Sequence, residues 1–237
     1  MVKKSVLLIL FLIAAFNLSK IQAEVVFKLD FSHSIGSVKE WFQDRGWKYV
    51  HNFHDMHPRF KGGKLVIEAK DDDFGAVAKK FDVGNELKNV KKIRILWGVN
   101  QYPSGVVWSG PKNKPRNPRE AIAVIISFGT KKLPSGSIFR PDQPYFIGLF
   151  LHNNAKPAYP YFGNYYQEGG RYYCIPCDGS VNRDIITEVD ITELFEQTFG
   201  LEAPPITALA IETDVTETKQ KNHIHSKAYI KRIEMFE

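Results

Sequence analysis

Short apolar runs dominate this sequence and limit the folds that it can adopt. Eight runs of six to nine residues are bounded by Gly, Pro, Asn or Asp, which is the pattern of β-strands joined by turns. Most alternate in polarity, whereas Ala121–Phe128 is almost continuously apolar, as in a strand buried on both faces. This pattern predicts an all-β fold, a single β-sandwich or jelly roll. The expected strands cover residues 24–31, 64–69, 76–81, 93–99, 121–128, 145–151, 206–211 and 228–236.

Two short segments have helical spacing instead. Residues 37–45 place Val38, Trp41 and Phe42 on one face, and Ser37 with Glu40 matches a capping box. Residues 191–199 follow Asp190, a suitable N-cap, and precede Gly200, a suitable C-terminal residue. The sandwich is therefore expected to carry one or two short helices.

The first 23 residues have the layout of a secretory signal peptide. Lys3 and Lys4 precede an apolar run of 11 residues, and the segment ends at the small residue Ala23. An uncleaved N-terminal anchor is the alternative, although the run is shorter than the roughly 20 residues of a membrane span. We expect residues 1–23 to be removed, leaving one domain over residues 24–237 with no membrane span, in the periplasm or secreted.

Part of the basic charge belongs to this leader. The chain has 32 Lys and Arg against 26 Asp and Glu, a formal charge of +6, and losing three leader lysines leaves 6 − 3 = +3. Much of the remainder lies in residues 104–119, which read as a polyanion contact or as a solvated, proline-stiffened loop. Export argues against a nucleic-acid partner. The basic residues of this loop are Lys112, Lys114, Arg116 and Arg119.

Aromatic residues are concentrated in one later segment. Residues 159–173 hold six of the ten tyrosines of the chain. A tyrosine offers an apolar face and a hydroxyl, so such a segment suits stacking on sugar rings. The alternative is a loop that packs its own rings over one end of the sandwich. The candidate ligand-binding residues here are Tyr159, Tyr161, Tyr165, Tyr166 and Tyr172.

A Cys-x-x-Cys motif follows this segment at Cys174 and Cys177. Three interpretations stay open: a redox dithiol, half of a zinc site, or a local disulfide in an oxidising compartment. The flanking residues look like a loop, and the chain holds no second Cys-x-x-Cys. The pattern therefore favours the disulfide.

Three carboxylates near the C-terminus are spaced as Glu-x-Asp-x-x-Glu. Glu212, Asp214 and Glu217 resemble the catalytic strand of the β-sandwich glycoside hydrolases of family sixteen, where the two Glu would be nucleophile and acid/base. The sequence departs from that motif at Thr213, and only 20 residues follow Glu217. The alternative is a polar turn between the last two strands.

A broader resemblance covers nearly the whole mature chain. The resemblance rests on the LDFS start, the IRILWGVNQYPSG segment, the AIAVIISF run and the strand ending in Thr213-Asp214 before a final strand near Tyr229. In these features the chain resembles an uncharacterised bacterial exported family, domain of unknown function 3047. That resemblance implies a jelly-roll-like sandwich, similar to carbohydrate-binding modules and lectin-like domains, with no established activity.

These observations predict a non-catalytic module that binds carbohydrate or cell-envelope glycan. Tyrosines of the aromatic segment would stack on the ligand, and Asp214 would make a polar contact. We expect no cofactor apart from a structural calcium ion held by Asp214 and Glu212, since all-oxygen sites suit calcium. The alternatives are a hydrolase of polysaccharides, with Glu212, Asp214 and Glu217 as its catalytic residues, and an envelope protein that binds another protein.

Overall fold

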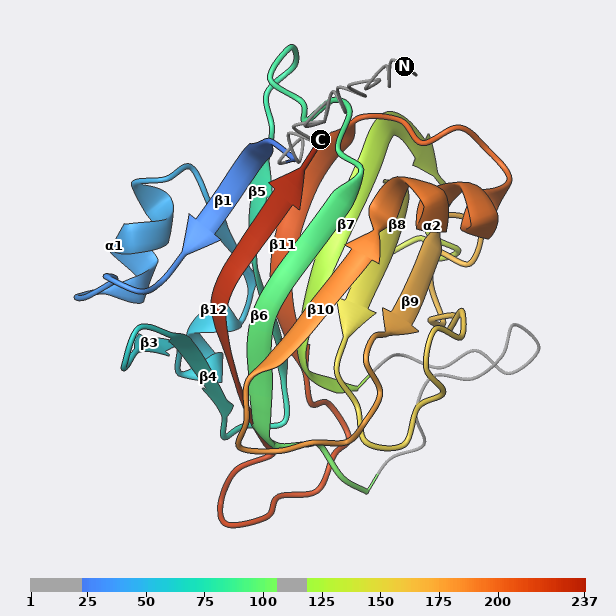
Figure 1. The fold of residues 1–237 in the computed structure, drawn as a ribbon. Helices are drawn as coiled ribbons and strands as arrows, with labels where there is room; N and C mark the ends of the chain where they lie inside the picture. The colour runs from blue at the N-terminus through green and yellow to red at the C-terminus, as the bar shows by residue number, and fades with distance from the viewer. Residues whose placement is uncertain (1–22, 106–118) are drawn as a thin grey trace, which may run out of the picture.

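A computed structural model describes residues 23–105 and 119–237 of the chain. Two six-stranded sheets pack face to face (Figure 1), so the expected all-β sandwich is confirmed. Each expected strand is present within a few residues of its predicted bounds. The strands that the sequence did not predict are short or lie within the aromatic segment: β2 (Lys48–His51), β3 (Arg59–Phe60), β9 (Gly170–Cys174) and β10 (Ile185–Asp190).

The first sheet faces the viewer in Figure 1 and has the order β10-β6-β12-β4-β3. Its centre is the last strand, β12 (Ser226–Phe236), beside β6 (Lys92–Gln101). The other side of β12 pairs with two strands in succession, β4 (Leu65–Ala69) along its first half and β1 (Val25–Asp30) along its second.

The second sheet lies behind the first, in the order β2-β5-β11-β7-β8-β9. β11 (Ile206–Asp214) pairs with β5 (Phe74–Lys80) on one side and with β7 (Glu120–Leu133) on the other. β8 (Gln143–Phe150) then pairs antiparallel with β7 and parallel with β9. One face of this sheet packs on the first sheet, and the other, its outer face, positions the candidate site.

The helices begin where the sequence predicts. α1 (Val38–Gln43) is capped by Ser37, whose Oγ accepts a 3.3 Å hydrogen bond from the Glu40 N–H. α2 (Ile191–Phe199) is capped by Asp190 and ends at Gly200 with φ of 68°. Phe195 of α2 packs on Phe128, with 4.6 Å between ring centroids, so the helix closes one end of the sandwich. A single 3-10 turn, η1 (Phe53–Met56), follows β2.

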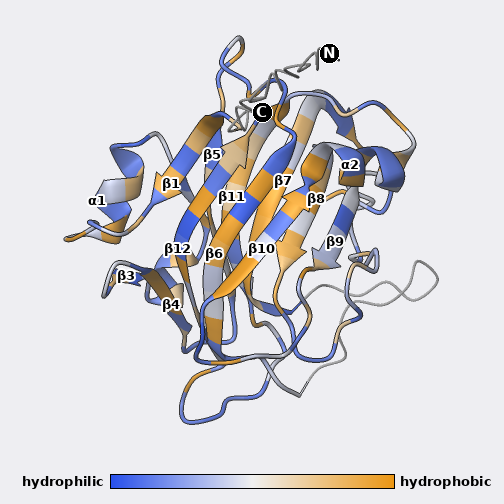
Figure 2. Ribbon diagram, in the orientation of Figure 1, coloured by the Kyte–Doolittle hydropathy of each residue, from blue (hydrophilic) through white to orange (hydrophobic). Residues whose placement is uncertain are grey.

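The alternation of apolar and polar residues along the strands is visible in Figure 2. The apolar sets of both sheets meet in one core, in which Trp97 is fully buried. Its indole N–H donates to the Thr187 hydroxyl at 2.9 Å, so the polar atom of this ring is satisfied inside the core.

Two expectations fall on residues outside the described ranges. The predicted signal peptide occupies residues 1–23, of which only Ala23 is described, and most of the basic loop, residues 106–118, is likewise outside. Among residues 23–105 and 119–237, no helix has the length and apolar character needed to cross a bilayer.

Candidate functional site

The outer face of the second sheet brings together carboxyl, tyrosine and small side chains from strands that are distant in sequence. Strand register aligns Ala78, Ala210, Ile125, Gly148 and Tyr172 in one row across β5, β11, β7, β8 and β9. Alternate residues of a strand share a face, so the residues of this row lie on the same face of the sheet. The row has small residues at one end and a tyrosine at the other. Ala78 and Ala210 are partly exposed.

The next rows carry the carboxylates. Glu212 is aligned with Ala76 and Ala123, and Asp214 is aligned with Phe74 and Glu120. Between these pairs one residue of β11 opposes two residues of β7, so β7 contains a bulge. The bulge turns Glu120 onto the face that carries Glu212 and Asp214.

Glu120 and Glu212 interact directly. Glu120 is only 1% exposed, and its Oε2 has no hydrogen-bond partner in the part of the chain that the structure describes, whereas Glu212 is partly exposed. Burial is the main cause that raises the pKa of Glu212 to about 8, and the Asp214 charge adds to it. Burial, followed by the charges of Glu212 and Asp214, raises the pKa of Glu120 well above its ordinary range. The pair therefore holds protons that isolated carboxyls release.

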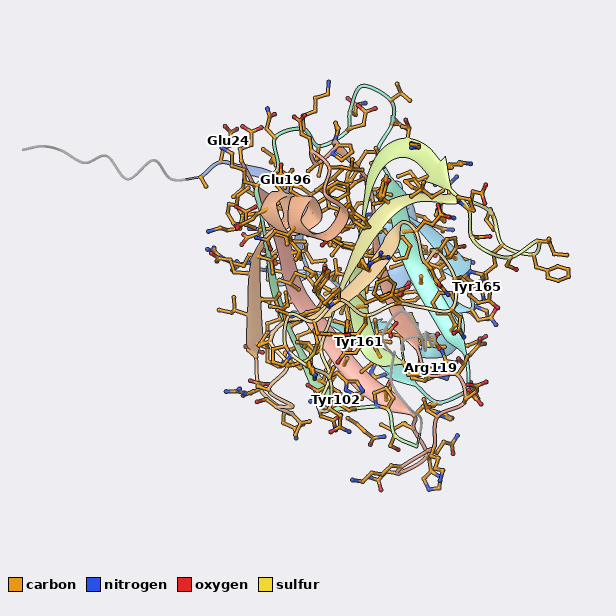
Figure 3. The ribbon with its side chains drawn as sticks, turned by 90° about the vertical axis from the view of Figure 1, so that its right-hand side faces the viewer. Glu24, Tyr102, Arg119, Tyr161, Tyr165 and Glu196 are labelled. Carbon is orange, nitrogen blue, oxygen red and sulfur yellow. A yellow bond between two sulfur atoms is a disulfide. The ribbon has the colours of Figure 1, made fainter. Side chains whose placement is uncertain are left out.

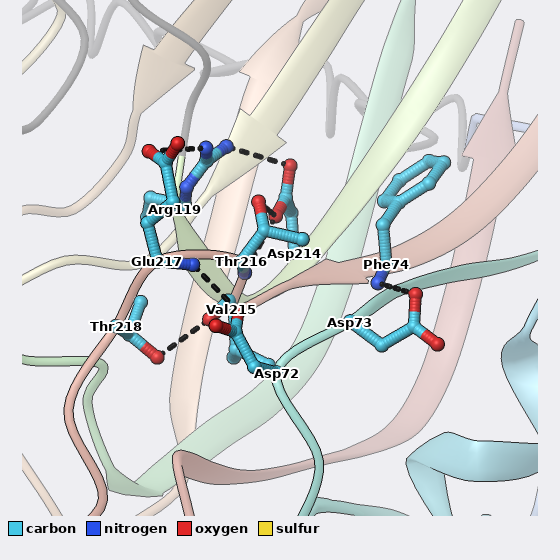
Figure 4. Close-up of polar contacts among 9 residues, drawn as sticks. All are labelled: Asp72, Asp73, Phe74, Arg119, Asp214, Val215, Thr216, Glu217 and Thr218. Carbon is cyan, nitrogen blue, oxygen red and sulfur yellow. Dashed lines mark hydrogen bonds and ion pairs between the residues drawn. The ribbon is translucent and has the colours of Figure 1, made fainter.

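Asp214 is stabilised differently. One of its oxygens accepts from the Arg119 guanidinium at 2.9 Å, and the other accepts from the N–H and hydroxyl of Thr216. Arg119 also contacts Glu217 at 3.2 Å (Figure 4). The Arg119 side chain is only 7% exposed, whereas that of Glu217 is 81% exposed.

Glu217 therefore does not share the strand face of Glu212 and Asp214. It follows β11 in a turn, with φ of 62°, and its N–H donates to Asp72. The residue spacing that resembles a catalytic strand brings Glu212 and Asp214 together. The carboxyl that approaches Glu212 comes from the neighbouring strand, at Glu120.

Tyr172 is the tyrosine that reaches toward this carboxyl cluster. A Cβ built on Gly148 would lie 2.6 Å from Tyr172 Cδ1 and 2.8 Å from Ile125 Cδ1, so the tyrosine ring lies over Gly148 toward β7. Burial is the main cause that raises the pKa of Tyr172 well above 10, and the charges of Glu212, Glu120 and Asp214 act in the same direction. Tyr172 therefore remains a neutral hydroxyl beside the carboxyls.

The other candidate tyrosines pack largely on neighbouring side chains. Tyr161 is 7% exposed, its hydroxyl accepts from the Lys156 N–H, and its ring contacts Tyr159 with 5.0 Å between centroids. Tyr166 packs on Phe146, and the Arg140 guanidinium lies 4.2 Å from the Tyr165 ring. Figure 3 shows Tyr165 and Arg119 on the side of the molecule opposite Glu196 of α2.

The structure joins Cys174 and Cys177 in a disulfide. Cys174 ends β9, so the residues before the motif form a strand, not the loop that the sequence indicated. Its sulfur belongs to a small second core with Phe150, Tyr161 and Ala123. The disulfide thus anchors the end of the strand that carries Tyr172.

No group of three or more metal-ligating side chains occurs within residues 23–105 and 119–237. One Asp214 oxygen accepts a hydrogen bond from Arg119, and the other accepts one from Thr216. The structural calcium ion expected from Glu212 and Asp214 therefore stays a prediction.

Sequence reasoning missed Glu120 and Arg119 as members of this site. Glu120 precedes an apolar run and reads as its polar boundary, and Arg119 reads as the end of a basic loop. Their approach to Asp214 depends on the pairing of β7 with β11 and on the bulge, across a sequence separation of 95 residues for Arg119 and Asp214. The one local indication of this site in the sequence is a charged residue at the start of a buried strand.

Comparison with known proteins gives distant likeness only. No family model matches the sequence, and no curated protein matches it, so the resemblance to the exported family stays a prediction. A structure named BiXyn10A CBM1 APO shares 7% identity over 90% of this chain and 99% of its own, with a TM-score of 0.35. The carbohydrate recognition domain of Emp47p shares 9% identity over 88% and 94%, with a TM-score of 0.36.

Proposed function

We propose that this protein binds a glycan on the outer face of its second sheet, without hydrolysing it. The observation that carries the proposal is the meeting of Tyr172, Glu212 and Asp214 on one sheet face, next to the partly exposed alanines of β5 and β11. A sugar ring presents an apolar face and a rim of hydroxyls, which suits an aromatic ring beside polar side chains.

The small side chains support this proposal because they leave space above the sheet. Ala78 and Ala210 are neighbours across β5 and β11, and the row continues through Ile125 to Gly148 beneath Tyr172. A flat apolar surface bordered by a tyrosine is what a pyranose ring can lie on.

The carboxyl geometry favours binding over hydrolysis. A retaining glycosidase needs two carboxyls about 5–5.5 Å apart that face the sugar. Glu120 is hydrogen-bonded to Glu212 and buried, and Glu217 lies in an exposed turn. Neither provides a second accessible carboxyl on the face of Glu212.

Added bulk on the open part of the face tests the proposal. The Ala210→Leu variant keeps every polar contact described above but occupies the surface where the sugar would lie. We expect affinity for the bound glycan, identified on a glycan array and measured by calorimetry, to fall about tenfold. The matched control is Ile186→Ala, which changes a 63% exposed apolar residue on β10 of the other sheet.

Two results would count against the proposal. Wild-type protein that binds no glycan on a broad array would remove the proposed function. An Ala210→Leu variant with wild-type affinity would move the binding surface away from this face, particularly if Ile186→Ala weakened binding instead.

We further propose that the protein works in the periplasm or outside the cell. The disulfide between Cys174 and Cys177 supports this proposal, because disulfides persist in oxidising compartments. Cell fractionation with detection of the mature protein tests it, and protein retained at full length in the cytoplasm would contradict it.

A further inference from the structure

We propose that the carboxyl cluster of Glu120, Glu212 and Asp214 recognises an ammonium group, so that the glycan bound on this face contains amino sugars. This inference rests on the proposed function and adds the chemical class of the ligand. It concerns a cluster in which, within residues 23–105 and 119–237, only Asp214 forms an ion pair with a guanidinium, that of Arg119.

The first support for this inference is the set of ion pairs that the carboxyl cluster forms. Asp214 and Glu217 both form ion pairs with Arg119, at 2.9 and 3.2 Å. No ion pair within residues 23–105 and 119–237 involves Glu120 or Glu212 with a Lys or Arg. Within these ranges the Arg119 guanidinium therefore contacts Asp214, whereas Glu120 and Glu212 have no Lys or Arg ion-pair partner.

The buried oxygen of Glu120 carries the second step. Glu120 is 1% exposed, and its Oε2 lacks a hydrogen-bond partner among the described residues; an unpaired buried polar atom has a free-energy cost. Its side chain points toward Glu212 with a hydrogen bond between the two. A cationic donor that reaches Glu212 from the open face would favour the ionised form of the Glu120–Glu212 pair. This interaction would offset the cost of the unpaired oxygen.

An ammonium group fits this position better than a metal ion does. A calcium ion takes six to eight oxygen ligands, and both Asp214 oxygens are occupied by Arg119 and Thr216. An ammonium has three donors, and Glu212 is the partly exposed carboxyl that it would meet. The neutral Tyr172 ring nearby adds a π-face, which also attracts a cation.

The surroundings of the cluster include other charged and titratable groups. Glu120 begins β7 and Arg119 directly precedes this strand, whereas Glu212 and Asp214 come from β11. Among the described residues, Tyr172 of β9 and the more distant Arg140 and Tyr166 also act on these carboxyls or lie near them. Because the carboxyl pair holds its protons in the free protein, binding of an ammonium releases a proton.

A matched pair of ligands tests the inference. Glucosamine oligosaccharides carry ammonium groups, and the same oligosaccharides with N-acetyl groups do not. We expect the full-length mature protein to bind the glucosamine form at least about tenfold more tightly near neutral pH, as for a charge-assisted hydrogen bond. Calorimetry in two buffers of different ionisation enthalpy should detect a proton released on binding.

Variants of the carboxyls test whether these residues cause the preference for glucosamine oligosaccharides. Glu212→Gln should reduce the preference to less than about threefold, while Glu196→Gln, the same change on the opposite side of the molecule, should preserve it. Glu120→Gln is the second variant, and circular dichroism with urea unfolding verifies that each variant is folded.

The outcomes separate the two proposals. If both oligosaccharides bind equally, or if the preference survives in Glu212→Gln and Glu120→Gln, the ammonium inference is overturned while glycan binding stands. If only neutral glycans bind, or if calcium restores binding after chelation, it is overturned as well. If no glycan binds at all, the proposed function fails together with it.

Discussion

The protein should lose stability as the pH rises, because the folded state holds a proton on Glu212 that the unfolded chain has released. The pKa of Glu212 is about 8 against an ordinary 4.5. A folded-state pKa above the unfolded value means that stability is fully present below about pH 4.5 and is lost as the pH rises toward 8. This difference in pKa corresponds to about 5 kcal/mol above pH 8, which is an upper limit.

Water that reaches the partly exposed Glu212 carboxyl reduces this penalty, so the measured loss of stability should be smaller than this limit. The Glu212→Gln variant keeps an amide donor beside Glu120 but has no proton to lose at this position. Urea unfolding followed by circular dichroism, at several pH values from about 5 to 9, measures the free energy of unfolding of both proteins. Relative to the wild type, the variant should gain stability as the pH rises from about 5 to 8, and the difference should then level off.

Glu196→Gln is the control, since it removes a carboxylate from α2 on the opposite side of the molecule (Figure 3). Its pH profile should run parallel to that of the wild type. If the profile of Glu212→Gln is also parallel to the wild type, Glu212 does not hold a proton at neutral pH, and the electrostatic description of the carboxyl pair is wrong.

Three further changes test the parts of the fold that support this face. Replacing both cysteines of the 174–177 disulfide by Ala should lower the free energy of unfolding by about 2 kcal/mol, the value for a four-residue loop; stability in urea that does not change on reduction of the wild type would contradict this. Gly148→Val should cost about 1–3 kcal/mol, because the new side chain meets Tyr172 and Ile125 within 3 Å, and a wild-type melting curve would show that Tyr172 does not lie over Gly148. Asp190→Ala removes the N-cap of α2 and should cost about 1 kcal/mol, with no loss expected if the helix is stabilised by packing alone.

The sequence predicts the strands and helices well where local chemistry determines them. The apolar run 121–128 and the capped segment 191–199 are found as β7 and α2, because burial on both faces and a side-chain cap leave few alternatives. The strand β9 was not predicted. Its tyrosines and glycines are typical of a loop, and only pairing with β8 makes it a strand.

The candidate site was only partly predictable for the same reason. Glu212 and Asp214 are two residues apart, and alternation alone places them on one face. Glu120 joins them through a bulge in the partner strand, which no local pattern reveals. The tyrosine cluster was recognised by composition, but only the register shows that Tyr172 extends toward the carboxyls while Tyr161 is buried in a second core.

The central claim is that ligand binds on the outer face of the second sheet, and backbone NMR tests it most directly. Titration of isotope-labelled protein with a glucosamine oligosaccharide should shift the amide signals of Ala210, Glu212 and Gly148 together, in one saturable process. Shifts confined to the first sheet, for example at Ile186 and Arg94 on β10 and β6, would contradict the claim.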